Sequence, residues 1–200
     1  MSHILPIVEG EGDLRAIPEL VRRILHDMGR FDVGIARPHR RGDLPKVRGR
    51  FDDFFRIALL ENCPILWVLD YDCETCTDQA RDIEELQSRA KQINLVAQCE
   101  FVFMVQEFES LFLADHETTR QVFSDIPADV NFPDDPESVR DAKGWISSAR
   151  PKGLRYKPTQ HQAKLAGQVD LCRLRKRSPS FRRFETAIHK LIRTEGVALP

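Results

Sequence analysis

One stretch of the chain restricts the possible folds more than any other: CPILWVLD at residues 63–70, a continuous apolar run that ends at an acid. A run of this kind, without polar alternation, is typical of a strand that a parallel sheet buries on both faces. Two further β-rich runs occupy residues 4–8 and 100–106, and a shorter one occupies residues 31–36. The sequence therefore predicts four strands.

Segments with helical spacing alternate with these strands. Residues 14–28 place apolar side chains three and four positions apart, as an amphipathic helix does. Helices are also predicted at residues 51–61 and 73–93, with a polar, basic loop at 37–50. This alternation predicts an α/β fold with a mostly parallel sheet and helices on both faces.

The pattern changes after about residue 125. Residues 123–138 contain three prolines and little apolar periodicity, and the segments that follow are helical and basic. We therefore predict an α/β core at residues 1–125. Residues 126–200 would form a linker and a basic helical C-terminal segment packed on that core.

Carboxylates follow three of the predicted strands, at the point where each strand ends. They are Glu9 and Asp13 after the first, Asp70 and Asp72 after the third, and Glu107 and Glu109 after the fourth. Because ligands of an open parallel sheet bind outside the carboxyl ends of its strands, we expect these groups to converge on one edge. Clustered carboxylates repel one another, so the pattern predicts a bound Mg²⁺ or Mn²⁺, cations that prefer oxygen ligands.

Each acidic group also has a simpler interpretation when it is taken alone. Asp13 could cap the helix that follows it, and the sequence DYD at 70–72 could form a turn after a strand. Glu107 or Glu109 could stabilise the N-terminus of a helix through its dipole. Their common position at strand ends favours the metal site.

The net charge of −1 conceals two segments of opposite sign. Residues 61–143 contain nineteen acidic and six basic residues, whereas residues 150–193 contain two acidic and thirteen basic residues. The simpler interpretation is that the two segments neutralise each other. The alternative is that the basic surface binds the phosphates of nucleic acid. The candidate residues are Arg40 and Arg41 in the first basic loop, and Arg175, Lys176 and Arg177 near the C-terminus.

The five cysteines are scattered and odd in number, so we expect no disulfide. Cys73 and Cys76 form a CxxC that could be half of a zinc site, but no second pair follows at the required spacing, and free thiols are the simpler expectation. No apolar run is long enough to cross a membrane, and residues 1–10 lack a basic leader. We expect a soluble, cytoplasmic protein without membrane association.

Two motifs resemble those of the Toprim domain: LPIVEGEGD at residues 5–13 and VLDYD at 68–72. With QEFESLFLAD at 106–115 and the segment that begins YKPTQHQ at 156, the chain resembles small stand-alone OLD-like or RloB-like Toprim proteins, which include families of unknown function. The resemblance covers nearly the whole chain. It implies a Toprim-like fold and an association with a partner ATPase in phage defence. Cys73 departs from the Toprim pattern, which often has a small residue there.

The resemblance implies metal-dependent hydrolysis of phosphodiesters in DNA or RNA. Asp70 and Asp72 would bind a divalent ion, and Glu9 would bind metal or act as a general acid or base. Glu107 or Glu109 would complete a second metal site.

The resemblance also assigns Lys157, which would neutralise charge on the scissile phosphate, although a surface lysine is the simpler interpretation. Two other functions stay open. One is a non-catalytic nucleic-acid or nucleotide-binding module. The other is a phosphatase or phosphotransferase that uses an Asp of DYD as nucleophile, which would need further Lys and Ser/Thr motifs that the neighbouring strand ends lack. The sequence does not determine the oligomeric state.

Overall fold

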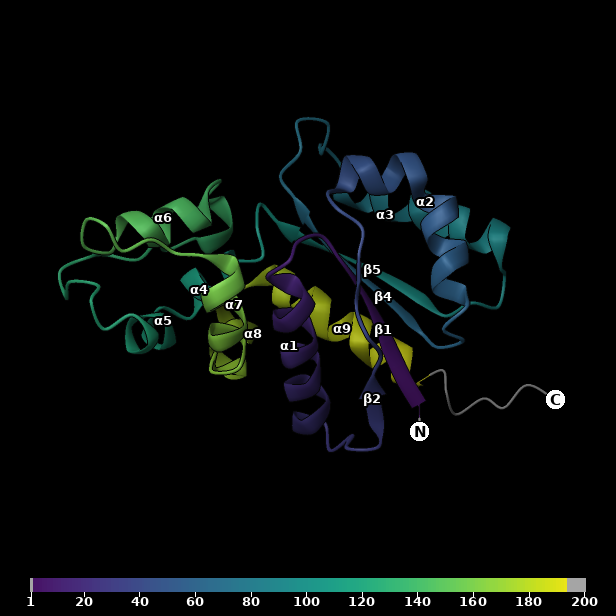
Figure 1. Ribbon diagram of the computed structural model, residues 1–200, viewed down its shortest axis with the longest axis horizontal. Coiled ribbons are helices and arrows are strands. Elements are labelled where there is room, and N and C mark those ends of the chain that lie inside the picture. Colours follow the sequence, from purple (N-terminus) through teal and green to yellow (C-terminus); the bar gives the residue numbers. More distant parts are fainter. Residues whose placement is uncertain (1, 194–200) are drawn as a thin grey trace.

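The computed structural model describes residues 2–193 of the chain, which form a five-stranded sheet flanked by helices (Figure 1). The strand order is β2-β1-β4-β5, and β3 pairs with the carboxyl end of β1. All pairs between these strands are parallel, which confirms the predicted mostly parallel sheet. The sheet has five strands rather than the predicted four, because the start of the predicted loop at 37–50 pairs with β1 as β3. The strands are β1 (Ser2–Val8), β2 (Val33–Ile35), β3 (His39–Arg40), β4 (Ile65–Tyr71) and β5 (Cys99–Val105).

The central strand β4 explains why helices cover both faces of the sheet. Its side chains alternate, so that Leu66 and Val68 enter one hydrophobic cluster while Trp67 and Leu69 enter the other. The first cluster packs against α1 (Asp13–Asp27) and α9 (Pro179–Arg193), and the second packs against α2 (Leu44–Leu59) and α3 (Gln79–Ile93). The continuous apolar run of the sequence is therefore a strand buried on both sides, as predicted.

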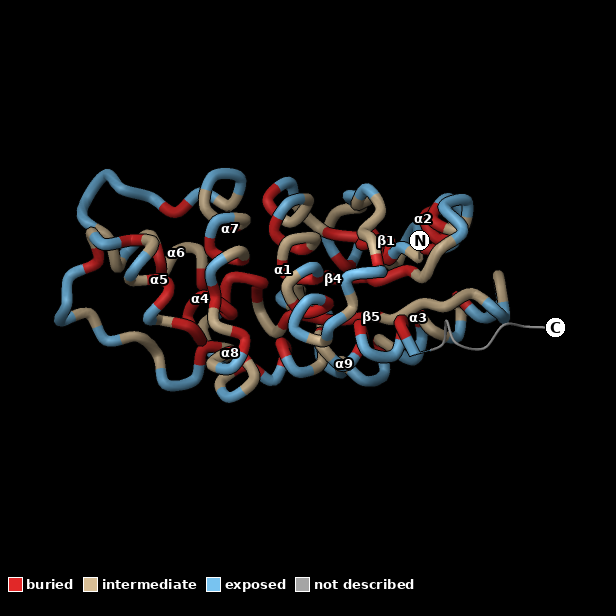
Figure 2. Tube along the Cα trace, turned by 90° about the horizontal axis from the view of Figure 1, so that it is seen from below, coloured by how far each residue is buried: buried red, intermediate tan, exposed pale blue. Residues whose placement is uncertain are grey.

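The remaining helices gather beyond the carboxyl ends of the strands, next to α1 (Figure 1). Buried segments continue from the sheet into α4, and α7 packs along α1 (Figure 2). The first hydrophobic cluster extends into this region through residues such as Phe112, Tyr156 and Leu165. These elements are α4 (Ser110–Ala114), α5 (His116–Val122), the 3₁₀ turn Pro136–Ser138, α6 (Ala142–Ser148), α7 (Pro158–Ala166) and α8 (Leu171–Arg177).

Two helices begin at residues other than those predicted. The predicted loop at 37–50 is wrong in its second half because α2 begins at Leu44, where the Asp43 side chain accepts a hydrogen bond from the Lys46 backbone N–H at 3.0 Å. Helix α3 begins at Gln79 rather than at residue 73, and Asp78 caps it.

The expectation of no disulfide is also wrong, because Cys73 and Cys76 are bonded in the loop before α3. An odd, scattered cysteine count does not exclude a local pair three residues apart. The bond also removes both thiols from the zinc alternative, since zinc binds thiolates. Cys63, Cys99 and Cys172 are free. No helix within residues 2–193 is long and apolar enough to cross a membrane.

Gly12 lets α7 approach the start of α1. A Cβ at this position would collide with the side chains of Gln162 and Pro158. We expect Gly12→Ala to lower the free energy of unfolding by about 1–3 kcal/mol, the usual cost of overpacking. Gly49 is the control, because it lies in α2 with no atom within 4 Å of an added Cβ, so Gly49→Ala should be neutral or stabilising. The free energies of unfolding of both variants and the parent are measured in urea. Equal stabilities of Gly12→Ala and Gly49→Ala would contradict the prediction.

Candidate functional site

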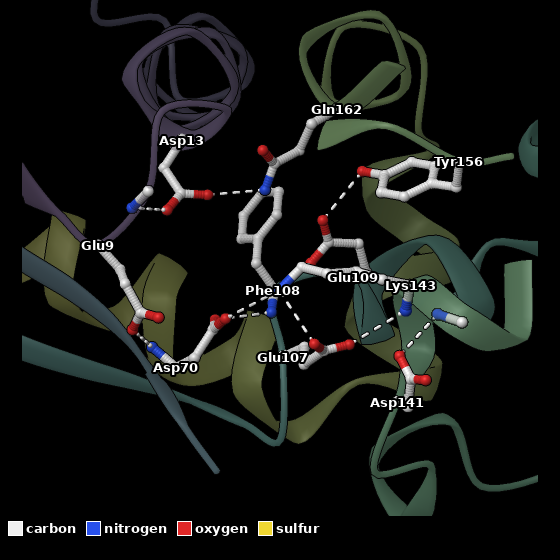
Figure 3. A network of polar contacts seen from close by, with 12 residues as sticks. Glu9, Asp13, Asp70, Glu107, Phe108, Glu109, Asp141, Lys143, Tyr156 and Gln162 are labelled. Atoms are coloured by element: carbon white, nitrogen blue, oxygen red, sulfur yellow. Dashed lines mark hydrogen bonds and ion pairs between the residues drawn. The ribbon is translucent and has the colours of Figure 1, made fainter. Parts of the chain in front are cut away.

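The carboxyl ends of β1, β4 and β5 bring four acidic side chains together: Glu9, Asp70, Glu107 and Glu109 (Figure 3). Hydrogen bonds join the strand ends. The Asp70 backbone N–H donates to Glu9 Oε2 at 3.3 Å, and the Phe108 backbone N–H donates to Asp70 Oδ1 at 2.8 Å. We call these four residues, together with Lys143, the carboxylate cluster.

Lys143 lies among the four acids, at the start of α6. Its Nζ is 3.0 Å from Glu107 Oε1 and 3.5 Å from both Asp70 Oδ2 and Glu109 Oε2. The Lys143 backbone N–H also donates to Glu107 Oε2 at 3.1 Å, which fixes α6 against the end of β5. One ammonium group thus partly neutralises three carboxylates from two strand ends.

Glu109 is the most buried member of the cluster, with no exposed surface. Its Oε1 accepts a hydrogen bond from the Tyr156 hydroxyl at 3.0 Å, whereas Oε2 has no hydrogen-bond partner and faces Lys143 at 3.5 Å. Burial raises the pKa of Glu109 to about 7, although Lys143 opposes the shift. A buried carboxylate oxygen without a hydrogen bond is costly unless a cation lies next to it.

Asp13 connects the glycine turn after β1 to α7. Its Oδ2 accepts a hydrogen bond from the Gly10 backbone N–H at 2.7 Å, and its Oδ1 accepts one from Gln162 Nε2 at 2.7 Å. Asp13 is the first residue of α1 but bonds backward to Gly10, so it does not cap α1 in the way the simpler interpretation supposed. Gln162 is buried, and its Oε1 has no hydrogen-bond partner.

The cluster holds more negative charge than Lys143 can neutralise. Burial, with Asp13 and Asp72 nearby, raises the pKa of Glu9 to about 7. Burial also raises the pKa of Asp70 well above its usual range, and Glu9 and Glu109 add to the effect. Burial alone would lower the pKa of Lys143, but Glu109, Asp70 and Glu107 raise it above its usual range. The ammonium therefore stays charged at neutral pH, and the excess negative charge favours a further cation.

The donor set fits Mg²⁺ or Mn²⁺, because it consists of carboxylate oxygens with one unbonded oxygen on Glu109. As the side chains lie, no three His, Cys, Asp or Glu residues within 2–193 surround a single point closely enough to hold a metal ion. Lys143 explains this, because its ammonium group lies where a shared cation would contact Asp70, Glu107 and Glu109. A metal ion at this position requires Lys143 to move aside.

Without a metal ion, the protein should lose stability between pH 4.5 and about 7, the ordinary and the raised pKa of Glu109. In this range the folded state holds a proton that the unfolded state has released, so rising pH favours unfolding, by up to about 3 kcal/mol from this group. Glu109→Gln removes the titrating group and should reduce this pH dependence. Urea unfolding of both proteins in EDTA across this range tests the prediction, and equal pH dependences would contradict it.

The other predicted site residues lie outside the carboxylate cluster. Asp72 is exposed, next to the Cys73–Cys76 loop. Lys157 is exposed at the start of α7, and within the described residues its side chain forms no ion pair with the cluster. Lys143, rather than Lys157, lies among the acids, and the role that the resemblance implies for Lys157 stays a prediction. The available signal was slight: Lys143 is one of six basic residues in the acidic segment 61–143.

The predicted phosphate-binding residues have different surroundings. Arg175 pairs with Asp27 and Glu185, and Arg177 donates to the Pro133 carbonyl at 3.0 Å. These two arginines connect segments of the protein, but neither pairs with an acid of residues 61–143, whereas Lys176 is exposed. Arg150 and Arg173 do pair with acids of that segment, Asp125 and Asp115, as the neutralisation interpretation expects. Arg40 pairs with Glu11 at 3.2 Å, and Arg41 follows β3 at the end of β1.

Comparisons with known proteins give structural likenesses and one sequence family. No curated protein matches the sequence. The C-terminal region of the Burkholderia pseudomallei OLD protein is similar at 13% identity and a TM-score of 0.48, over 95% of this chain and 98% of that one. The same region of the Xanthomonas campestris pv. campestris OLD protein is similar at 14% identity and a TM-score of 0.46, over 98% and 99%. Residues 8–189 match the family described as Domain of unknown function (DUF4276), and the chain belongs to this family.

Proposed function

We propose that the protein is a nuclease that hydrolyses phosphodiester bonds of DNA or RNA with the help of Mg²⁺ or Mn²⁺. The observation that carries the proposal is the convergence of Glu9, Asp70, Glu107 and Glu109 at the carboxyl ends of three parallel strands, with Lys143 among them. This is the edge at which open α/β sheets bind ligands. The resemblance to OLD-like Toprim proteins adds a partner ATPase and a role in phage defence to the proposal.

Glu9, Asp70 and Asp72 would hold one metal ion, and Glu107 and Glu109 would hold a second. A bound ion of this kind polarises phosphate oxygens and lowers the pKa of a bound water. Tyr156 orients Glu109 through its hydroxyl, and Gln162 orients Asp13.

Two residues of the cluster suit the movement of charge and protons during hydrolysis. Glu9, if its carboxylate does not bind a metal ion, could instead take a proton from an attacking water. Lys143 is partly exposed, so its ammonium can turn from the carboxylates toward a phosphate oxygen and neutralise the charge that grows there.

A non-catalytic nucleic-acid or nucleotide-binding module is the second candidate. The observation that favours it is Lys143, whose ammonium group pairs with three carboxylates of the cluster. In that case the cluster would be a structural ion-pair network.

Crystals soaked in Mn²⁺ distinguish the two candidates. We expect anomalous density next to Glu9 and Asp70, with Lys143 displaced from Asp70, and cleavage of labelled DNA or RNA that EDTA abolishes. Soaking with Ca²⁺ should fill the same position and serves as the control for occupancy. The nuclease proposal would be abandoned if neither ion binds at the cluster and no cleavage occurs in Mg²⁺ or Mn²⁺.

A further inference from the structure

Two arginines share one aromatic ring beside the carboxylate cluster. The Cζ atoms of Arg41 and Arg50 each lie 5.1 Å from the centre of the Phe54 ring, which belongs to α2. The Arg41 backbone N–H donates to the Val8 carbonyl at 2.9 Å. Val8 is the last residue of β1 and directly precedes Glu9, so the Arg41 backbone lies beside the end of β1. The backbone of Arg41 is thus next to the acidic edge, and both guanidinium groups lie over the Phe54 ring of α2.

Neither guanidinium is neutralised by a well-formed ion pair. Within residues 2–193, Arg41 has no ion pair, and its Nη2 lies 3.2 Å from Nδ1 of His39, whose pKa is lowered by burial. Among the described residues, the one ion pair of Arg50 is with Asp53, at 3.6 Å, and the two side chains are 61% and 67% exposed. Exposed pairs of this kind contribute little.

Two other arginines on aromatic rings are neutralised by carboxylates, whereas Arg120, 5.1 Å from the Phe132 ring, donates to the carbonyls of Pro127 and Val130. Arg89 lies 5.2 Å from the Phe51 ring and donates to Asp52 Oδ1 at 2.8 Å. Arg150 lies 4.3 Å from the Phe123 ring and donates to both carboxylate oxygens of Asp125. The Arg41–Arg50 pair lacks such a carboxylate, and the two like charges repel each other. An anion between them would remove this repulsion.

We propose that Arg41 and Arg50 clamp a backbone phosphate of a nucleic-acid strand, an inference that rests on the proposed nucleic-acid function. The planar guanidinium group donates two parallel hydrogen bonds to phosphate oxygens. Phe54 is only 6% exposed, so its ring holds the arginines by cation–π contact and offers no face to a base. The clamp therefore recognises phosphate and is independent of base sequence.

The position of the clamp favours a polymer over a small phosphate ester. A strand with one phosphate at the carboxylate cluster brings neighbouring phosphates along the same edge, and the residue pair Val8–Arg41 lies next to Glu9 on that edge. A small ester would fill only one of the two sites. Free phosphate shares the chemistry, and the experiment separates it from nucleic acid.

The test measures binding of fluorescein-labelled oligonucleotides of two unrelated sequences to the full chain in EDTA, by anisotropy over a range of KCl concentrations. Losing the one phosphate contact in the double variant Arg41→Gln/Arg50→Gln should reduce the slope of log K against log salt by roughly 0.7–0.9. It should weaken binding roughly five- to tenfold, equally for both sequences. Arg89→Gln, which removes a ring-bound but neutralised arginine, is the control and should leave the slope unchanged.

The measurement does not depend on catalysis, so a failed nuclease assay and a failed clamp remain distinguishable. Thermal melting of both variants checks that the fold is retained, and Arg50→Gln alone, at an exposed position, serves if the double variant does not fold. An unchanged affinity and slope, or no nucleic-acid binding by the parent, would overturn the proposal. Displacement of the oligonucleotide by inorganic phosphate beyond the effect of ionic strength would also overturn it, in favour of a free-phosphate site.

Discussion

Replacing Asp70 with Asn should abolish cleavage while leaving the protein at least as stable as the parent. Asn keeps an oxygen that can accept the hydrogen bond from the Phe108 backbone N–H, so the strand ends stay connected. It removes a buried carboxylate whose pKa is raised by burial and by the neighbouring Glu9 and Glu109, which relieves repulsion within the metal-free cluster. A metal ion loses an anionic ligand, so activity should fall by more than the roughly 10–100-fold that changes behind a metal ligand cause.

The measurements for Asp70→Asn are initial cleavage rates in Mg²⁺ and Mn²⁺ and the melting temperature in EDTA. Asp129, an exposed acid outside the cluster, provides the control Asp129→Asn, which should change neither value. Glu9→Gln should behave like Asp70→Asn, and Asp72→Asn should be milder because a metal ion tolerates one neutral oxygen ligand. If Asp70→Asn cleaves as fast as the parent, the metal site lies elsewhere.

The sequence predicted the sheet well because its strongest signal, the apolar run of β4, reports burial on both faces directly. The convergence of Glu9, Asp70, Glu107 and Glu109 followed from topology, since parallel strands end on the same edge. Helix α2 was placed too late because its first turns carry Lys, Arg and Gly, residues that indicate a loop when taken together. Membership of the Toprim superfamily stays a prediction.

The residues that complete the cluster could not be predicted in the same way. Lys143 belongs to none of the motifs noted in the sequence, and Tyr156 and Gln162 both lie in the YKPTQHQ segment at residues 156–162, which has no fixed spacing from Glu9 or Asp70. They reach the cluster because α6 and α7 pack beyond the strand ends, around Gly12 and α1. Such contacts depend on tertiary packing, which a single sequence does not reveal. The basic C-terminal charges were visible and their internal pairing was the simpler interpretation, but the individual partners of Arg175, Asp27 and Glu185, could not be predicted.

Lys143→Met should test two roles of this lysine: the proposed neutralisation of a reacting phosphate, and its ion pairs with three carboxylates of the cluster. The loss of a preorganised positive charge near a reacting phosphate should lower the cleavage rate roughly 10²–10³-fold. In EDTA the variant should also be less stable, because Asp70, Glu107 and Glu109 lose their shared partner. The loss should stay below the roughly 3–5 kcal/mol of a broken buried pair, since the Lys143 side chain is 36% exposed. Mg²⁺ should stabilise the variant more than the parent, because the ion no longer competes with an ammonium group.

Lys157→Met is the matched control, because Lys157 is an exposed lysine of the same C-terminal region that forms no ion pair with the cluster within the described residues. It should keep the parent's cleavage rate, stability and response to Mg²⁺. The measurements are the cleavage rate in Mg²⁺ and the melting temperatures in EDTA and in Mg²⁺, for the parent, Lys143→Met and Lys157→Met. If Lys157→Met loses activity and Lys143→Met does not, the catalytic lysine is the one that the sequence resemblance assigned. In that case Lys143 is a structural counter-ion, and its displacement by a metal ion is not part of the reaction.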